Sequence, residues 1–201
     1  MDGILYLIPK TVDYETVLKK WEALTHLSLE TEEFERFYQF AINDYLGVSK
    51  GYFETKNPKL LKKKGLFIDT VSLGKGMQPM IIPKALNAYF ADGIPIKETV
   101  LNSKDINDFI TYQKVDKKFK VIYKEKVINR INRYYVATNA PYLFKQKDGG
   151  GLENLLKSSG VRIVNNLDEI KDFPKDINYN YYLSEIQKII DKFENKVLSL
   201  W

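Results

Sequence analysis

The sequence of 201 residues contains no cysteine, which excludes disulfide bonds, thiolate metal sites and a cysteine nucleophile. Long apolar runs are also missing. The longest, at residues 4–9 and 80–83, fall far short of the roughly 20 residues that a membrane-spanning helix needs. The N-terminus lacks the basic and then apolar segments of a secretory signal. We therefore expect a soluble, cytoplasmic protein whose fold is held by packing.

The sequence has one histidine and none of the common catalytic or cofactor-binding motifs. His26 has no second histidine with which to share a metal, so we predict that it lies on a helix face or in the core. Residues 74–76 (GKG) lack the upstream glycine that a phosphate-binding loop requires. Asp2 is the one acidic residue directly beside a predicted buried strand, where a carboxylate could hold a divalent ion.

Charge is unevenly distributed along the chain, whose 31 basic and 26 acidic residues give a formal net charge of +5. Residues 13–44 hold eight acids against three bases, whereas residues 56–64 hold five lysines and no acid. Residues 116–135 hold seven bases against two acids. Lysine runs are usually solvated surface, but these two basic stretches are also compatible with a polyanionic partner.

Hydrophobic periodicity predicts a mixed α+β chain with a boundary between residues 93 and 116. The apolar run at residues 3–9 predicts a buried strand. Helical spacing of apolar residues predicts two amphipathic helices, at residues 17–24 and 34–45. Residues 62–68 are basic and then apolar, which fits a strand that enters a sheet.

The middle of the chain carries two further helix signals. Residues 80–90 have helical spacing, and Gly93 is suited to end that helix. Ser103 is suited to be the N-cap of a helix over residues 104–112.

The last third of the chain predicts a small β element and a long helix. Residues 133–138 and 142–145 are predicted to form a hairpin, with the glycines at 149–151 as a tip that follows it. Residues 181–198 repeat apolar side chains on one helical face, which must pack against other elements.

Three segments, 2–6 (DGILY), 62–65 (KKKG) and 176–182 (DINYNYY), occur in an order that resembles the C-terminal palm and thumb of a family B DNA polymerase of the protein-primed, phage and plasmid branch. The first is similar to the last acid and following strand of the palm's Tyr-x-Asp-Thr-Asp metal motif. The second is similar to the Lys-Lys-Arg-Tyr-like motif that contacts the primer, with Gly65 in place of the aromatic residue. Further similar segments lie at 84–90, 93–99, 105–109 and 133–145.

The resemblance implies a partial palm β-sheet with packed helices over residues 1–95, and a mainly helical thumb with a small β-hairpin over residues 96–201. It implies that Asp2 is catalytic and binds Mg²⁺ together with acids of a partner. Motif A and the fingers helix of the family do not occur, so we expect the isolated chain to be inactive. The implied partners are primer-template DNA and the remaining polymerase piece, in the host cytoplasm if the source is viral.

A thumb that holds a duplex of any sequence needs phosphate contacts from Lys and Arg rather than contacts to base edges. The predicted DNA-binding residues come from the two basic stretches: Lys62, Lys63, Lys64, Lys117, Lys118, Lys120, Arg130 and Arg133. Strand alternation predicts that Lys63 points away from Lys62 and Lys64. Four interleaved tyrosines are suited to stack on sugars or to bond phosphates, although core packing is the commoner role: Tyr112, Tyr123, Tyr134 and Tyr135.

Three interpretations therefore stay open at the level of sequence. The chain is an excised fragment or split subunit of a family B polymerase, or it is a stand-alone DNA-binding or regulatory phage protein derived from a thumb. The third interpretation is an unrelated α+β scaffold whose lysines only keep it in solution. Salt-sensitive DNA binding separates the first two from the third.

Overall fold

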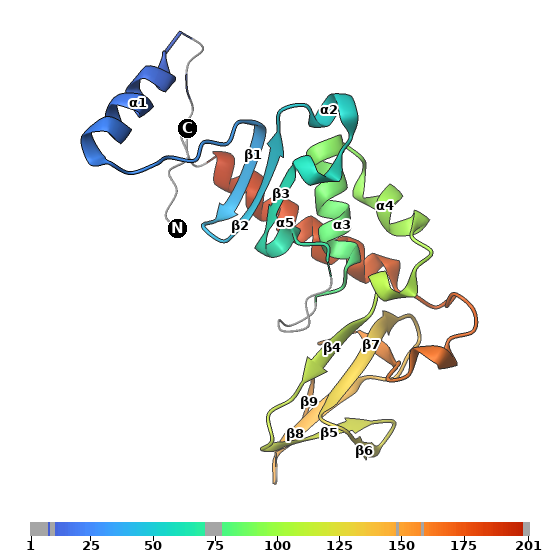
Figure 1. The fold of residues 1–201 in the computed structure, drawn as a ribbon. Coiled ribbons are helices and arrows are strands. Elements are labelled where there is room, and N and C mark those ends of the chain that lie inside the picture. The colour runs from blue at the N-terminus through green and yellow to red at the C-terminus, as the bar shows by residue number, and fades with distance from the viewer. Residues whose placement is uncertain (1–7, 9–10, 71–77, 148, 158, 199–201) are drawn as a thin grey trace. The chain divides into compact units, whose positions relative to one another are not determined.

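The computed structural model describes residues 8, 11–70, 78–147, 149–157 and 159–198 (Figure 1). In this part of the chain, five α-helices and ten strands in three small antiparallel sheets confirm the predicted α+β class. None of these helices combines the length and the apolar character that crossing a membrane requires. The strand predicted at residues 3–9, apart from Ile8, and the GKG segment lie outside the described residues. The chain divides into two compact units, residues 1–34 and 35–201.

In the first unit, α1 (Tyr14–Thr25) confirms the helix predicted over residues 17–24. The Asp13 carboxylate caps it by accepting hydrogen bonds from Thr16 Oγ1 at 2.6 Å and Thr16 N at 3.1 Å, which lower the pKa of Asp13. His26 is the exposed C-cap with φ +58°, which corrects the prediction of a helix-face or core residue. No residue of α1 is buried.

Residues 34–45 form two strands in place of the predicted second helix. β1 (Phe34–Ala41) and β2 (Asp44–Ser49) are neighbours in a sheet that β3 (Leu61–Lys64) completes, in the order β1-β2-β3. The segment is rich in Phe and Tyr, which favour strands. Its apolar positions are spaced so that they partly fit strand alternation as well as a helix, and a short turn at residues 42–43 reverses the chain.

Short helical turns flank β3. α2 (Tyr52–Thr55) and η1 (Pro58–Leu60) precede it, and η2 (Gly65–Phe67) follows it. Gly65 has φ +58°, and a Cβ there would lie 1.9 Å from an Asp44 side-chain oxygen and 2.2 Å from the Asn43 carbonyl oxygen. The fold requires glycine at this position, because a side chain would clash with the β1–β2 turn.

α3 (Ile81–Asn87) continues into a π-helical turn, η3 (Ala88–Asp92), and ends at Gly93 with φ +71°, which confirms the helix predicted there. Gly93 donates its N–H to the Tyr89 carbonyl at 3.0 Å. The next helix, α4 (Ile96–Asn102), begins directly after Pro95, a residue that cannot continue a preceding helix.

The helix predicted over residues 104–112 does not form. Ser103 is the extended C-cap of α4, and its hydroxyl donates to Asp108 Oδ2 at 2.7 Å. η4 (Ile106–Asp108) and the strand β4 (Thr111–Lys114) take the place of that helix. The buried Asp108 carboxylate also accepts a 2.5 Å hydrogen bond from Lys84 Nζ of α3, and this pair fastens the turn to α3.

Seven strands lie between residues 111 and 163, where the prediction had one hairpin in a mainly helical thumb. β7 (Ile131–Ala137) is the centre of a sheet with the order β10-β7-β4, whereas β8 (Leu143–Lys147) belongs to a sheet with the order β6-β5-β8-β9. Both predicted strands exist, but their pairing with each other is wrong. The remaining elements are β5 (Phe119–Tyr123), β6 (Lys126–Ile128), β9 (Leu152–Asn154), β10 (Gly160–Ile163) and η5 (Leu167–Glu169).

The start of β10 explains why β8 does not pair with β7. Val161 N donates to the Pro141 carbonyl at 2.9 Å, and a Cβ at Gly160 would lie 2.0 Å from the Ala140 carbonyl oxygen. β10 therefore occupies the place beside β7, in antiparallel register from Gly160 opposite Ala137. The glycines at 149–151 join β8 to β9.

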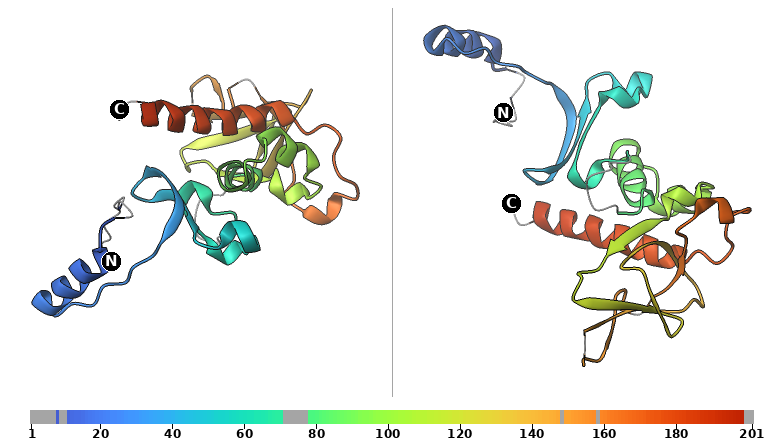
Figure 2. Two further views of the ribbon diagram at one scale, coloured as in Figure 1. Left: turned by 90° about the horizontal axis from the view of Figure 1, so that it is seen from above. Right: turned by 60° about the horizontal axis from the view of Figure 1, so that its bottom comes forward.

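The last predicted helix is confirmed as α5 (Tyr179–Leu198), which packs on α3 and α4 (Figures 1 and 2). Tyr182 is fully buried: its hydroxyl accepts a hydrogen bond from Val136 N at 2.9 Å and donates to the Phe109 carbonyl at 2.8 Å. It belongs to the larger of two core clusters, which has members from both sides of residue 95. The smaller cluster comprises Val115, Val121, Tyr134, Leu143 and Val161.

Candidate nucleic-acid interface

The antiparallel pairing of β4 with β7 gathers basic side chains on one face of their sheet. Lys114 lies opposite Ile131, and Tyr112 lies opposite Arg133. Residues two apart in a strand share a face, so these four side chains lie on the same face, which we call the basic face. Lys114, Ile131 and Arg133 are exposed and Tyr112 is half-buried. The intervening positions on the other face include the buried Val115 side chain of the smaller core cluster.

A hollow of about 400 Å³ adjoins the basic face at the end of β4 and the start of β7. Its lining, here called the basic hollow, comprises Lys114, Val115, Asp116, Lys117, Arg130 and Ile131. The two chain segments are tied together by a 2.9 Å hydrogen bond from Val115 N to the Arg130 carbonyl. Three cationic side chains against one carboxylate make this hollow suited to an anion.

The lysine segment of β3 alternates as predicted. Lys62 and Lys64 are exposed, whereas Lys63 is half-buried and its Nζ lies 2.7 Å from Asp69 Oδ2. Asn87 of α3 donates to the same oxygen at 3.1 Å. Lys63 therefore fastens β3 to the helix layer, and Lys62 and Lys64 are the lysines of this segment that face outward.

Lys64 has an aromatic neighbour as well as an outward position. It lies opposite Tyr45 of β2, and its Nζ is 5.7 Å from the centroid of that ring. A cation at this distance from an aromatic face is attracted to it, which restrains the lysine without removing its charge.

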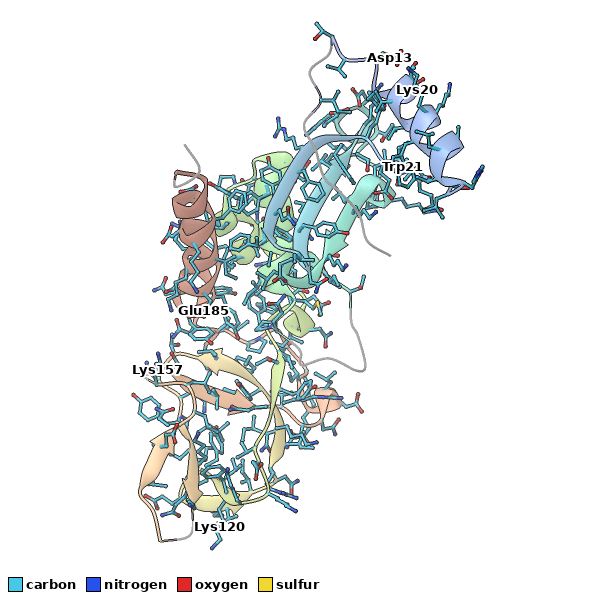
Figure 3. The ribbon with its side chains drawn as sticks, turned by 90° about the vertical axis from the view of Figure 1, so that its left-hand side faces the viewer. Asp13, Lys20, Trp21, Lys120, Lys157 and Glu185 are labelled. Atoms are coloured by element: carbon cyan, nitrogen blue, oxygen red, sulfur yellow. The ribbon has the colours of Figure 1, made fainter. Side chains whose placement is uncertain are left out.

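Two predicted residues of the second basic stretch, Lys118 and Lys120, belong neither to the basic face nor to the basic hollow. Lys118 Nζ is 5.4 Å from the centroid of the Phe119 ring, and the exposed Lys120 lies opposite Gln146 in the β5–β8 pair. Figure 3 shows Lys120 at the far end of this sheet. The structure thus brings Lys117, Arg130 and Arg133 together with Lys114, whereas Lys118 lies in the turn before β5 and Lys120 lies on β5.

Two of the four interleaved tyrosines, Tyr134 and Tyr135, are buried, and Tyr123 is half-buried with its hydroxyl bonded. Tyr123 donates its hydroxyl to the Val161 carbonyl at 2.9 Å, and Tyr135 donates to Asp176 Oδ1 at 2.9 Å. Burial raises the pKa of Tyr134 to about 12. Tyr112 differs from these three, because it lies on the basic face.

The Arg162 side chain is also committed to a structural contact. Its Nε donates to Asp176 Oδ2 at 2.8 Å, and that carboxylate accepts the Tyr135 hydroxyl on its other oxygen. Hydrogen bonding to the carboxylate raises the pKa of Arg162. This arginine therefore links β10 to the turn before α5.

The predicted metal ligand Asp2 lies outside the described residues. Among the residues that the structure does describe, no group of three or more acidic, histidine or cysteine side chains could hold a metal ion.

Sequence reasoning did not single out Lys114. It lies two residues before the basic stretch that begins at residue 116, and Ile131, its partner in β7, comes 17 residues later in the chain. Alternation within β4 was the available signal, but it identifies a face only when the paired strand is known.

Comparisons of this chain with protein-family models, with curated proteins and with solved structures find no match. The assignment of function therefore depends on the geometry of the basic residues and on the order of segments in the sequence.

Proposed function

We propose that this chain is a C-terminal palm and thumb piece of a family B DNA polymerase that grips primer-template duplex. In this proposal it supports template-directed DNA synthesis together with the remaining polymerase piece, which carries the other palm acids and the fingers. Asp2 then joins the acids of that piece, and Mg²⁺ supplies the nucleotidyl-transfer chemistry in the assembled enzyme. The isolated chain is inactive.

The observation that carries the proposal is the basic face of β4 and β7 with its adjoining hollow. Lys114 and Arg133 lie on one exposed face, and Lys117 and Arg130 extend the positive charge around the hollow. The basic face and the basic hollow are formed by strands and the segments that adjoin them, and not by a projecting helix that could enter the major groove. Such a surface is suited to contacts with phosphates at any sequence, which is the task of a polymerase thumb.

The exposed lysines of β3 supply a second contact in the proposal. The sequence resemblance assigns Lys62 and Lys64 to the motif whose lysines contact the primer in that family. Lys63 is paired with Asp69, so it fixes the strand from which the other two project. The proposal accordingly assigns DNA contact to two lysines of this segment and a positioning role to the third.

The test is fluorescence anisotropy of a labelled primer-template across a salt series. Replacing Lys114 and Arg133 by Ala should weaken binding about tenfold at low salt. It should also reduce the slope of log K against log salt by about 2, because each phosphate contact releases close to one counterion. A matched control replaces Lys171 and Lys192, two exposed lysines outside the basic face, and should change neither quantity. An unchanged slope in the first variant would remove the basic face from the DNA interface.

Catalysis is tested in a mixture with the polypeptide that carries the remaining polymerase. Mg²⁺-dependent primer extension should occur only in the mixture, and a change of Asp2 to Asn should abolish it while DNA binding is retained. Salt-dependent binding without extension in any mixture would favour a stand-alone DNA-binding protein. Absence of salt-dependent binding would favour a scaffold whose lysines serve only solubility.

A further inference from the structure

The basic face carries cationic and apolar side chains in a regular arrangement. Tyr112 lies opposite Arg133, and Lys114 lies opposite Ile131, so the two cations occupy one diagonal and the two apolar side chains the other. Diagonal neighbours across an antiparallel pair are about 7–8 Å apart. Each apolar side chain therefore has one cation directly across from it and a second one two residues away on its own strand.

The backbone holds these four side chains close together. The bond from Val115 N to the Arg130 carbonyl identifies a hydrogen-bonded pair of residues directly beside the basic face. Hydrogen-bonded and non-hydrogen-bonded pairs alternate along an antiparallel ladder, so both pairs of the basic face are of the second kind, whose Cα atoms are only about 4.5 Å apart. On the β10 side, the Arg133 carbonyl accepts the Val164 N–H at 2.8 Å, which fixes β7. The arrangement is therefore set by the fold before any ligand binds.

The side chains of the basic face are available to a ligand. Within the part of the chain that the structure describes, the side chains of Lys114 and Arg133 make no ion pair or hydrogen bond, and the Tyr112 ring contacts no other aromatic ring. Arg162 of the same sheet differs from them, because its Nε lies 2.8 Å from Asp176 Oδ2. The two cations of the basic face thus keep their charge for a ligand.

The apolar diagonal of the basic face is open as well. Ile131 is 54% exposed, and Tyr112 is half-buried on β4, which is an edge strand of its sheet. The next residue of β7 on this face, Tyr135, is buried and bonded to Asp176, so the open part of the face ends there. Phosphate contacts alone make no use of an aromatic ring or a branched aliphatic side chain. A ligand that matches the whole face therefore has apolar surface next to its charges.

A single DNA strand has this composition. Its phosphates bind cations, and the faces of its bases are free to stack on aromatic and apolar side chains. In a duplex the faces of the bases are already stacked on one another, so a sheet that meets the duplex from the side finds phosphates and sugars. The alternation of cations with apolar side chains on the basic face therefore fits an unpaired strand better than a paired one.

We propose that the basic face binds an unpaired stretch of DNA, with a base against its two apolar side chains and the flanking phosphates against its two cations. The inference rests on the proposed function in that the ligand is the DNA of a primer-template. It assigns the basic face to the single-stranded template beside the duplex, and it leaves the duplex to Lys117 and Arg130 of the basic hollow and to the exposed lysines of β3. Every base has a face that can stack, so the site accepts any sequence.

The experiment measures, by anisotropy, binding of the full chain to two labelled single-stranded DNAs of equal length, one normal and one abasic at every position. Both carry the same phosphates, so charge alone predicts equal affinity. The proposal predicts that the normal strand binds at least about fivefold more tightly, as expected for one stacked base. Equal affinity would overturn the inference even if the chain binds primer-template in a salt-dependent way. Failure of the proposed function has a different signature, namely absence of salt-dependent binding to primer-template.

Two substitutions of Tyr112 assign the preference for the normal strand to the aromatic ring. Tyr112→Leu keeps an apolar side chain but removes the ring, so it should abolish most of the preference. Tyr112→Phe keeps the ring and should retain the preference. The matched control is Tyr142→Leu, at a tyrosine that is 46% exposed and lies outside the basic face. A preference that survives Tyr112→Leu unchanged would contradict the proposal.

A substitution at the exposed Ile131 tests the second apolar side chain with little risk to the fold. Ile131→Ser should weaken binding of the normal strand and leave abasic binding unchanged, whereas Arg133→Ala should weaken both, because it removes a phosphate contact that both strands share. The control is Val127→Ser on β6, where the side chain is 65% exposed. Unchanged abasic binding and an unchanged thermal midpoint show that Ile131→Ser is folded. Equal weakening of both strands by Ile131→Ser would contradict the assigned base contact.

Discussion

Tyr134 is buried in the smaller core cluster, and its ionisation makes the stability of the fold depend on pH in the alkaline range. Burial raises the pKa of its phenol to about 12, against about 10 for an exposed tyrosine, because the interior disfavours the phenolate. At pH values below 10 the phenol is protonated in both the folded and the unfolded chain. Between pH 10 and 12 the unfolded chain ionises first, so the free energy of unfolding falls with rising pH.

We expect Tyr134 to contribute a loss of up to about 3 kcal/mol of stability between pH 9 and pH 12, and Tyr134→Phe to remove this part of the loss. Urea unfolding followed by circular dichroism at several pH values measures it. Tyr142→Phe is the control, because that side chain is 46% exposed. If the pH dependence of unfolding is the same for Tyr134→Phe and the unchanged chain, the phenol does not resist ionisation in the fold.

At the scale of elements, the close approach of β10 to the β7–β8 connection depends on one missing side chain. A Cβ at Gly160 would lie 2.0 Å from the Ala140 carbonyl oxygen and 2.6 Å from the carbonyl carbon, both of which are backbone atoms. Relief of such a clash requires movement of a strand or of the connection. Gly160→Ala should therefore destabilise the protein by about 1–3 kcal/mol.

Gly151→Ala is the matched comparison, because nothing lies within 4 Å of a Cβ at Gly151 and the residue is in the β8–β9 connection. It should change the free energy of unfolding by no more than about 0.5 kcal/mol. Chemical denaturation of both variants measures the difference. Equal stabilities would show that the connection moves freely enough to accept a methyl group at Gly160.

The elements that the sequence predicts correctly are those with local signals. α3 ends at a glycine with positive φ, and α5 has an apolar face long enough to be unambiguous. The prediction of a helix over residues 34–45 was wrong because the spacing of the aromatic residues fits both the helical and the strand period. The predicted pairing of β7 with β8 was wrong because β10, which pairs with β7 instead, comes later in the chain than both strands.

The candidate site was predictable in part for the same reasons. Strand alternation predicted, without knowledge of the fold, that Lys63 lies on the other face of the strand from Lys62 and Lys64. The convergence of Lys114, Lys117 and Arg130 depends on the non-local β4–β7 register, and no pattern within either strand specifies that register.

At the scale of the whole molecule, the two compact units differ in net charge. Residues 1–34 hold seven acids and three bases, a net charge of −4, so the remaining residues carry +9. Both core clusters consist of residues beyond 34. The basic face and both cores thus belong to the second unit, and the net charge of each unit can be counted directly from the sequence.

The difference in burial between the units predicts a difference in local stability. α1 has 12 residues and none of them is buried, and an isolated helix of this length is marginal in water. Tyr182, Ile186 and Ile190 of α5 are buried to within 1% exposure. Amide protection from hydrogen exchange reports the free energy of local opening, which is small where few apolar contacts must be broken.

Hydrogen–deuterium exchange followed by mass spectrometry should therefore show rapid exchange of α1 amides at times when peptides from the middle of α5 and from β7 are still protected. Trp21→Ala should leave the exchange of α5 and β7 unchanged, because Trp21 is 40% exposed and lies outside both core clusters. Protection of α1 equal to that of α5 in the isolated chain would contradict the prediction. Protection that develops only after addition of the remaining polymerase piece would instead show that α1 becomes ordered by packing against that partner, as the proposed assembly allows.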